Sequence, residues 1–264
     1  MVGMISRKLM NFYGELAKAK GKESWEELLN CDGKVINAGE SANRDAIHLV
    51  NCFNNPIYCI DKMSTAAGER IEFNIGTYLA IRNLINGKSV VLHLPPQTFK
   101  STIAKAYVLY TLLFTEGYVA YTPNGHADTR QFQRGIAKMY HSLPEYLKLK
   151  PITEITNRII TESKKDDDQY EGKVILCLYD DLNKARVDKL KLDITIPTLI
   201  CNRLGEEDLW DDNLVTALRE VGANNFVQVR YNMFDLGQTM EDAKNAFKMY
   251  GEDLETFLKQ YVVK

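Results

Sequence analysis

The sequence predicts an α/β fold in which helices flank a mainly parallel sheet, with a helical N-terminal extension. Two observations favour this class. Short apolar runs of the kind found in buried strands alternate with longer segments of helical periodicity, and turn residues separate them. The chain has 264 residues, 45% of them apolar, which is enough for one sizeable core. We therefore expect a helical extension over 1–50 and one α/β domain over 51–264.

Two helices are predicted before the first strand of the sheet. Residues 1–30 have helical spacing of apolar residues and a capping box at Ser24 and Glu27. Residues 74–85 predict a second helix, which Asn86-Gly87 closes. The run SVVLHL over 89–94 then predicts a buried strand, and KSTIAKAYVLYTLLF over 100–114 predicts the helix that follows it.

The rest of the chain repeats this alternation. YVAYT over 118–122 predicts a strand, and a helix is expected from about 127 to 146. The alternation in ITEITNRIITES predicts an exposed hairpin strand whose charged tip is KKDDDQ, within 152–178. Three further strands and a helical C-terminal segment are expected, namely VILCLYDD, TLICN after Pro197, FVQVRY and residues 241–262.

Composition limits the possible functions only broadly. The 33 Lys+Arg and 35 Asp+Glu give a net charge of −2, so bulk charge neither favours nor excludes nucleic acid. Cysteines lack Cys-x-x-Cys spacing and favour reduced thiols, at Cys31, Cys52, Cys59, Cys177 and Cys201. No uncharged apolar run reaches the roughly 18 to 20 residues that a bilayer crossing needs, so we expect an intracellular protein without a membrane partner.

The stretch from Leu94 to Ser101 has the outline of a phosphate-binding loop between a strand and a helix. Both glycine positions hold other residues, and the second is Phe99, whose side chain would crowd a phosphate. Two prolines also remove amide donors. The residues that could still meet an anion are Gln97, Lys100, Ser101 and Thr102.

The order of these features resembles the ATPase domain of the tailed-bacteriophage terminase large subunit, the motor that packs DNA into capsids. The resemblance covers roughly 50–250. The segments that carry it are Asn55-Pro56-Ile57-Tyr58, Pro96 to Thr102, YVAYTPN over 118–124, and Leu143-Pro144-Glu145-Tyr146-Leu147.

Compared position by position, the resemblance implies a loop without its catalytic residues. Gln97, Lys100, Ser101 and Thr102 match the family's loop, but its glycine is Phe99 and its arginine is Pro96. The adenine-contacting glutamine falls at about Leu79, and the Asp-Glu pair that handles metal and water falls on Cys201-Asn202. The resemblance does not include the family's nuclease domain, which we do not expect within the sequence that ends at Lys264.

The resemblance therefore implies a viral pseudo-ATPase with a P-loop (phosphate-loop) NTPase-like fold and no hydrolysis. We expect no catalytic residue, no metal and no cofactor. Such a protein would act as a structural, adaptor or regulatory protein tied to phage DNA packaging. It would bind a protein partner, either a phage protein or a second copy, with double-stranded DNA a further candidate. Its place would be the cytoplasm of an infected host cell or the virion.

Two alternatives stay open. In the first, the chain is an active DNA-packaging ATPase that uses Lys100 and Ser101 with ATP and Mg²⁺, and Asp180 and Asp181 serve as the metal ligand and the base. In the second, the chain is a nucleic-acid-binding module. Arg130, Arg134 and Lys138 are spaced by four and share one helix face. The acidic run over 205–212 favours a helix N-terminus over a metal site.

Overall fold

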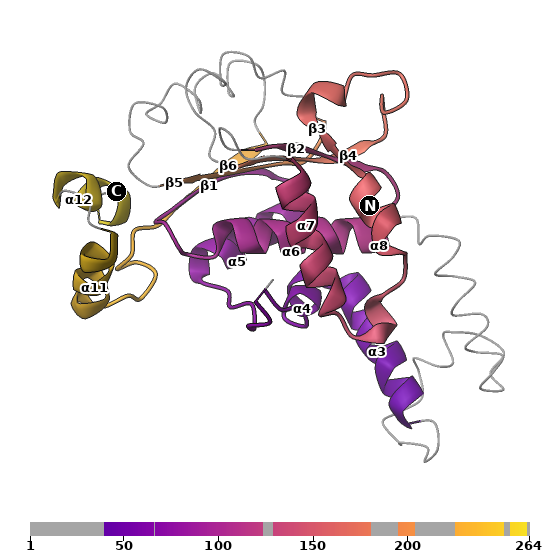
Figure 1. Ribbon diagram of the computed structural model, residues 1–264, viewed down its shortest axis with the longest axis horizontal. Helices are drawn as coiled ribbons and strands as arrows, with labels where there is room; N and C mark the ends of the chain where they lie inside the picture. The colour runs from indigo at the N-terminus through magenta and orange to yellow at the C-terminus, as the bar shows by residue number, and fades with distance from the viewer. Residues whose placement is uncertain are drawn as a thin grey trace.

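The computed structural model describes residues 40–65, 67–123, 129–180, 195–203, 225–250 and 254–262. Six strands form one sheet in the order β3-β2-β4-β5-β1-β6, and each pairing between them is parallel (Figure 1). The mainly parallel α/β fold predicted from the sequence is thus confirmed. The strands are β1 Ser89–Leu94, β2 Tyr118–Thr122, β3 Ile159–Thr161, β4 Val174–Asp180, β5 Thr198–Arg203 and β6 Phe226–Arg230.

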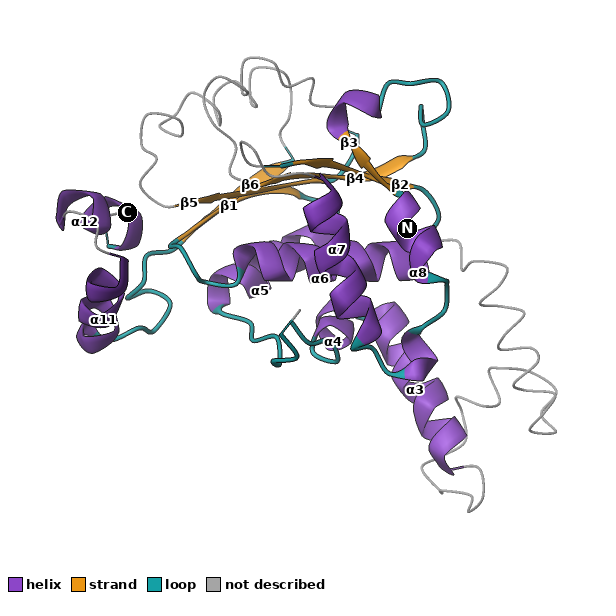
Figure 2. Ribbon diagram, in the orientation of Figure 1, coloured by secondary structure: helices purple, strands orange, loops and turns teal. Residues whose placement is uncertain are grey.

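The helices from α3 to α8 lie on one face of the sheet, whereas α11 and α12 lie beyond its end (Figures 1 and 2). Two short 3-10 turns, η1 Glu145–Leu147 and η2 Glu162–Lys164, complete the described elements. The helices are α3 Glu40–Asn54, α4 Pro56–Ile60, α5 Ile75–Ile85, α6 Lys100–Phe114, α7 Thr129–His141, α8 Ile152–Asn157, α11 Met240–Tyr250 and α12 Leu254–Tyr261.

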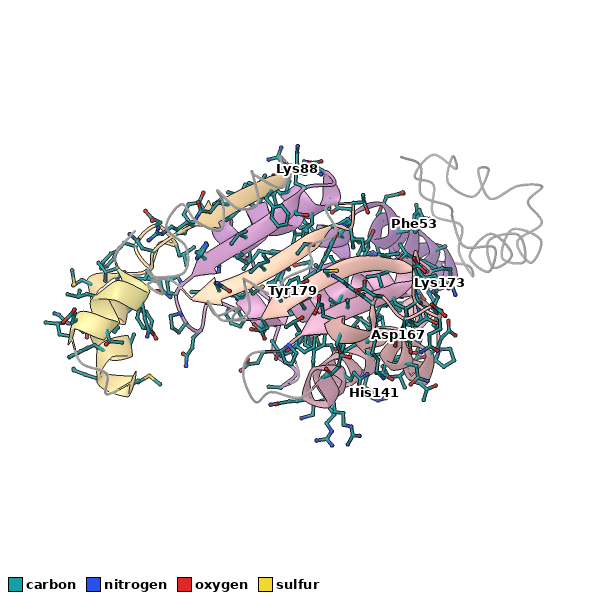
Figure 3. All side chains as sticks on the ribbon, turned by 90° about the horizontal axis from the view of Figure 1, so that it is seen from above. Phe53, Lys88, His141, Asp167, Lys173 and Tyr179 are labelled. Atoms are coloured by element: carbon teal, nitrogen blue, oxygen red, sulfur yellow. The ribbon has the colours of Figure 1, made fainter. Side chains whose placement is uncertain are left out.

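Successive side chains of the strands point to opposite faces of the sheet and belong to two apolar layers. Val90 and Leu92 of β1 join the large cluster under the helices, where Leu109 of α6 is fully buried. Val91 points to the opposite face and packs in a smaller cluster with Tyr179 of β4. Figure 3 looks down on this second layer, and Tyr179 lies near its centre. Because both faces are covered, these strands read as continuous apolar runs.

The connection from α6 to β2 is short and tightly held. Gly117 has φ +120°, and a Cβ there would lie 2.7 Å from the carbonyl oxygen of Lys173. Arg158 donates to the carbonyls of Leu112, Thr115 and Gly117 at 3.0, 2.6 and 2.7 Å. Three carbonyls at the end of α6 and in this connection are therefore satisfied by one buried side chain.

Lys150 supports the same helix end. Its Nζ donates to the carbonyls of Leu112 and Thr115 at 3.3 and 3.1 Å, and it pairs with Glu116 at 3.1 Å. Burial lowers the pKa of Lys150, because water no longer solvates its charge, and the nearby Arg158 acts in the same direction. Two cations thus stabilise the carboxyl end of α6, where the helix dipole is negative.

Most of the predicted elements are confirmed, and one is wrong. The strands at 89–94, 118–122, 174–180, 198–203 and 226–230 form as expected. The expected hairpin does not, because residues 152–157 form α8 and β3 pairs parallel with β2. Apolar residues at 152, 155 and 159 are spaced by three and four positions, which favours a helical turn over an alternating strand. The predictions for 1–39, 181–194 and 204–224 lie outside the described residues.

Candidate functional site

The candidate site is the loop that joins β1 to α6 at the carboxyl edge of the sheet. Its backbone enters the left-handed region at two residues that are not glycine, Gln97 with φ 57° and Phe99 with φ 62°. A Cβ in this conformation costs about 1–2 kcal/mol per residue. Phe99 occupies the last position before α6. The loop therefore keeps a glycine-like shape without glycine, and other contacts must offset the strain.

Three side chains supply these contacts. Thr98 is 5% exposed, and its Oγ1 donates to the carbonyl of Pro95 at 2.8 Å. Lys100 is 8% exposed, and its Nζ donates to the carbonyls of Leu94 at 2.5 Å and Pro95 at 3.1 Å. From outside the loop, Asn74 Nδ2 donates to the carbonyl of Thr98 at 2.9 Å. These hydrogen bonds thus hold a backbone conformation that glycines adopt without strain in phosphate loops.

The N-terminus of α6 faces this loop. No side chain caps it, and its first turn contains no acidic residue. The first N–H groups of a helix have no partner within the helix, and the dipole makes this end positive. Lys100 adds a formal charge, and the half-buried Ser101 and Thr102 follow it. The combination favours an anion with several oxygens, such as a phosphate chain.

Ser101 meets a carboxylate from another part of the chain. Its Oγ donates to Asp180 Oδ1 at 3.2 Å, across 79 positions in sequence. Asp180 is the last residue of β4, and β5 lies between β4 and β1. Asp180 therefore reaches the site although β5 separates its strand from β1. Asp181 lies outside the described residues.

The pair Cys201-Asn202 lies at the end of β5, which pairs directly with β1. Cys201 stands opposite Asp180 across the β4–β5 pairing. The resemblance aligned the family's two acidic residues with this pair, but the carboxylate that contacts the helix of the loop is Asp180. The site therefore has one carboxylate that the position-by-position comparison did not assign to it.

Phe99 and Gln97 both face outward. Phe99 is 39% exposed, and Gln97 is also exposed. The Phe99 ring is thus only partly covered by the rest of the protein.

The predicted basic stripe lies on α7. Arg130, Arg134 and Lys138 are all exposed, while Phe132 and Ile136 of the same helix are buried. No Asp or Glu occurs between Thr129 and His141. His141, at the end of this helix, lies at the margin of the molecule (Figure 3).

Sequence reasoning missed Asn74, Lys150 and Arg158. Asn74 carries a recognisable signal, because Asn followed three residues later by Thr at a helix start is a capping pattern. Its second contact, with Thr98, crosses 24 positions and leaves no local pattern. Among the described residues, no group of three or more His, Cys, Asp and Glu is arranged to hold a metal ion. Within the same residues, no helix has the length and apolar character for a membrane crossing.

No protein-family model and no curated protein matches this sequence. Solved structures do match. The large terminase of bacteriophage HK97 is similar with a TM-score of 0.55 and 9% identity, over 79% of this chain and 54% of that one. The large terminase of a thermophilic bacteriophage gives 0.45 and 12%, over 72% and 53%. The UvsW helicase of bacteriophage T4 gives 0.44 and 11%, over 84% and 78%.

The sheet order, the loop and α6 place this protein in the class of α/β folds that resemble phosphate-loop NTPases. Within that class, its fold is similar to that of the HK97 large terminase, and the chain spans about half the length of that protein. At 9% identity the likeness concerns the fold alone.

Proposed function

We propose that this chain binds a nucleoside triphosphate, ATP, together with Mg²⁺ at the loop between β1 and α6. The observation that carries the proposal is the 3.2 Å contact between Ser101 Oγ and Asp180 Oδ1. In phosphate-loop proteins, a hydroxyl after the lysine and an acidic residue at the end of another strand of the sheet hold Mg²⁺ together. Mg²⁺ keeps several waters and needs only one or two carboxylates beside the phosphate oxygens, so this pair fits it.

The rest of the loop supports phosphate binding but limits its strength. Lys100 Nζ already donates to two carbonyls, at 2.5 and 3.1 Å, and a phosphate oxygen has to compete with them. Pro95 and Pro96 have no N–H to offer. The uncapped N-terminus of α6 supplies the remaining donors. We therefore expect binding that depends on Mg²⁺ and has modest affinity.

The likeness to a large terminase supports a role in phage DNA packaging, beside a phage protein or a second copy as partner. The chain would then work in the cytoplasm of an infected host cell or in the virion. Turnover in this proposal rests on Asp181, which would orient the attacking water. If the chain binds nucleotide without turnover, it acts as a non-hydrolysing adaptor or regulator. The absence of amide donors at Pro95 and Pro96 favours this second form.

Isothermal titration with ATP, with Mg²⁺ and with EDTA, tests the proposal. The wild-type protein should bind in Mg²⁺ only, and Asp180→Asn should lose that Mg²⁺ dependence. Lys100→Met should weaken binding by about tenfold or more. Asp168→Asn, which changes an exposed carboxylate in the turn before β4, is the matched control and should bind like wild type. Absence of binding by the wild-type protein would overturn the proposal. Phosphate release by wild type but not by Asp181→Asn would establish turnover.

A second candidate function, binding of nucleic acid, is favoured by the exposed face of α7. Its cations are spaced to follow a phosphate backbone, and the helix has no acidic residue to oppose them. Filter binding of double-stranded DNA across a salt series tests it. Arg134→Ser with Lys138→Ser should lower the slope of log K against log salt by about 2. A control that removes Arg82 and Lys164, which are exposed elsewhere on the surface, should leave the slope unchanged. Equal slopes in all three proteins would exclude this surface.

A further inference from the structure

Asn74 contacts two parts of the site region at once through the two ends of its side-chain amide. Its Oδ1 accepts from the N–H of Thr77 at 2.9 Å and caps α5. Its Nδ2 donates to the carbonyl of Thr98 at 2.9 Å. Thr77 completes the cap, because its Oγ1 accepts from the N–H of Asn74 at 3.0 Å. Asn74 is thus a helix cap and a tie to the phosphate loop.

The second contact falls at the most strained point of the loop. Thr98 lies between Gln97 and Phe99, the two residues with positive φ. The carbonyl of Thr98 belongs to the peptide unit that leads into Phe99, so the orientation of that unit sets the φ of Phe99. Because C=O and N–H point in opposite directions in a trans peptide, a carbonyl turned toward Asn74 turns the N–H of Phe99 away from it.

The first turn of α5, which follows Asn74, is held in place by close packing against β1. Gly76, in the first turn of α5, approaches β1 so closely that a Cβ would lie 2.6 Å from Leu94 Cδ2. Leu94 is the last residue of β1, directly before the loop. The start of α5 is therefore packed against the start of the loop, and Asn74 bridges from there to its end.

We infer that Asn74 is a positioning residue for the phosphate loop. Its side-chain amide holds the backbone in the conformation that a glycine at position 99 would otherwise provide. Its hydrogen bond holds the Thr98–Phe99 peptide in the orientation that a glycine at 99 would adopt without strain. The choice of residue type agrees with this role. Ser, Thr, Asp and Asn all cap helices well, but only Asn has an acceptor and an N–H₂ donor on separate atoms. The inference rests on the proposed function, since the loop it shapes is the proposed phosphate site.

Two substitutions separate the cap from the tie. Asn74→Ser keeps a capping oxygen but is too short to reach Thr98, and Asn74→Asp keeps the cap but loses the donor and adds a negative charge near the phosphates. Both should lower the Tm only slightly, because the cap is kept and a single hydrogen bond to the loop is lost. The Kd for Mg·ATP should rise about fivefold to tenfold in Asn74→Ser and more in Asn74→Asp. Thr77→Val is the matched control, because it removes the hydroxyl half of the capping box and leaves the tie to Thr98 in place. It should lower the Tm and leave the Kd unchanged.

Amide hydrogen exchange without ligand gives a second, independent readout. Asn74→Ser should speed exchange over 97–101 and leave α5 unchanged, whereas Thr77→Val should do the reverse. If the wild-type protein binds Mg·ATP and both Asn74 variants bind equally well, the inference is wrong while the proposed function stands. If the wild-type protein binds no nucleotide, the proposed function fails, and the exchange data alone decide whether Asn74 shapes the loop. Unchanged exchange over 97–101 in Asn74→Ser would then refute it.

Discussion

Ser101 and Asp180 lie within hydrogen-bonding distance, 3.2 Å between Oγ and Oδ1, although 79 positions separate them. One lies in the first turn of the helix after β1, and the other ends β4, two strands away in the sheet. The carboxyl ends of parallel strands meet at one edge, so a short helical turn at that edge can bridge the intervening strand.

This contact should be measurable without any ligand. Ser101→Ala and Asp180→Asn should each lower the free energy of unfolding, and the double variant should lose less than the sum of the two. We expect a coupling energy of up to about 1 kcal/mol, because Ser101→Ala removes the hydrogen bond and Asp180→Asn, whose amide oxygen can still accept, removes its charge-assisted part. Urea unfolding of the four proteins measures it. Additive losses would mean that the two side chains do not interact in solution.

Phe99 offers a test of backbone strain against steric blocking. Phe99→Gly removes about 1–2 kcal/mol of left-handed strain but adds about 0.5–1 kcal/mol of chain entropy, so its stability should equal or exceed that of wild type. Phe99→Val, with a β-branched side chain at positive φ, should lose about 1–2 kcal/mol. Thermal unfolding compares them. Mg·ATP affinity should change little in Phe99→Gly, since the ring is exposed. A gain of tenfold or more would show that the ring blocks the site.

Arg158 should be among the most sensitive positions in the molecule. Arg158→Met removes three hydrogen bonds at the end of α6, although Lys150 still donates to the carbonyls of Leu112 and Thr115, and should cost about 2–4 kcal/mol. Arg158→Lys cannot reproduce the planar fork and should recover only part of the loss. Arg82→Met, at an exposed arginine of α5, is the control and should stay near wild type. Urea unfolding reports all three. Wild-type stability in Arg158→Met would contradict the capping role.

Alkaline conditions should destabilise the protein through its buried and partly buried tyrosines. Desolvation raises the pKa of Tyr107 to about 12 and that of Tyr146 to about 12. The unfolded chain ionises at the ordinary value, near 10. Their contribution is therefore complete below pH 10 and is lost as the pH rises from 10 to 12. The loss is at most about 2–3 kcal/mol for Tyr107 and smaller for Tyr146, which solvent screens more. Tyr107→Phe should make the fall in unfolding free energy shallower. An identical pH profile would contradict this assignment.

The sequence predicted the parts of the fold that depend on local patterns. Gly87, with φ +73°, ends α5 where Asn86-Gly87 predicted, and β5 starts directly after Pro197 because proline cannot donate to the sheet. The hairpin prediction for 152–157 was wrong, because Ile152 and Ile155 are three positions apart, which is a helical spacing. Lys100 and Ser101 were recognisable as candidate site residues from their position at the start of a helix. Asp180 was one of several acidic candidates, and only the strand order brings it to Ser101. The tie from Asn74 to Thr98 could not be found, because it depends on packing between α5 and β1.

The length of the connection between α6 and β2 also determines which face of the sheet each β2 side chain occupies. An added residue there would shift β2 by one position and turn each of its side chains to the opposite face. Val119 and Ala120 would exchange layers, and both apolar layers would lose their fit. The exposed turn over 166–169, which ends several residues before β4 begins, has no such constraint. Natural length variation, fluorescent labels and affinity tags therefore belong at that turn, while the short join after Phe114 must keep its length for the sheet to assemble.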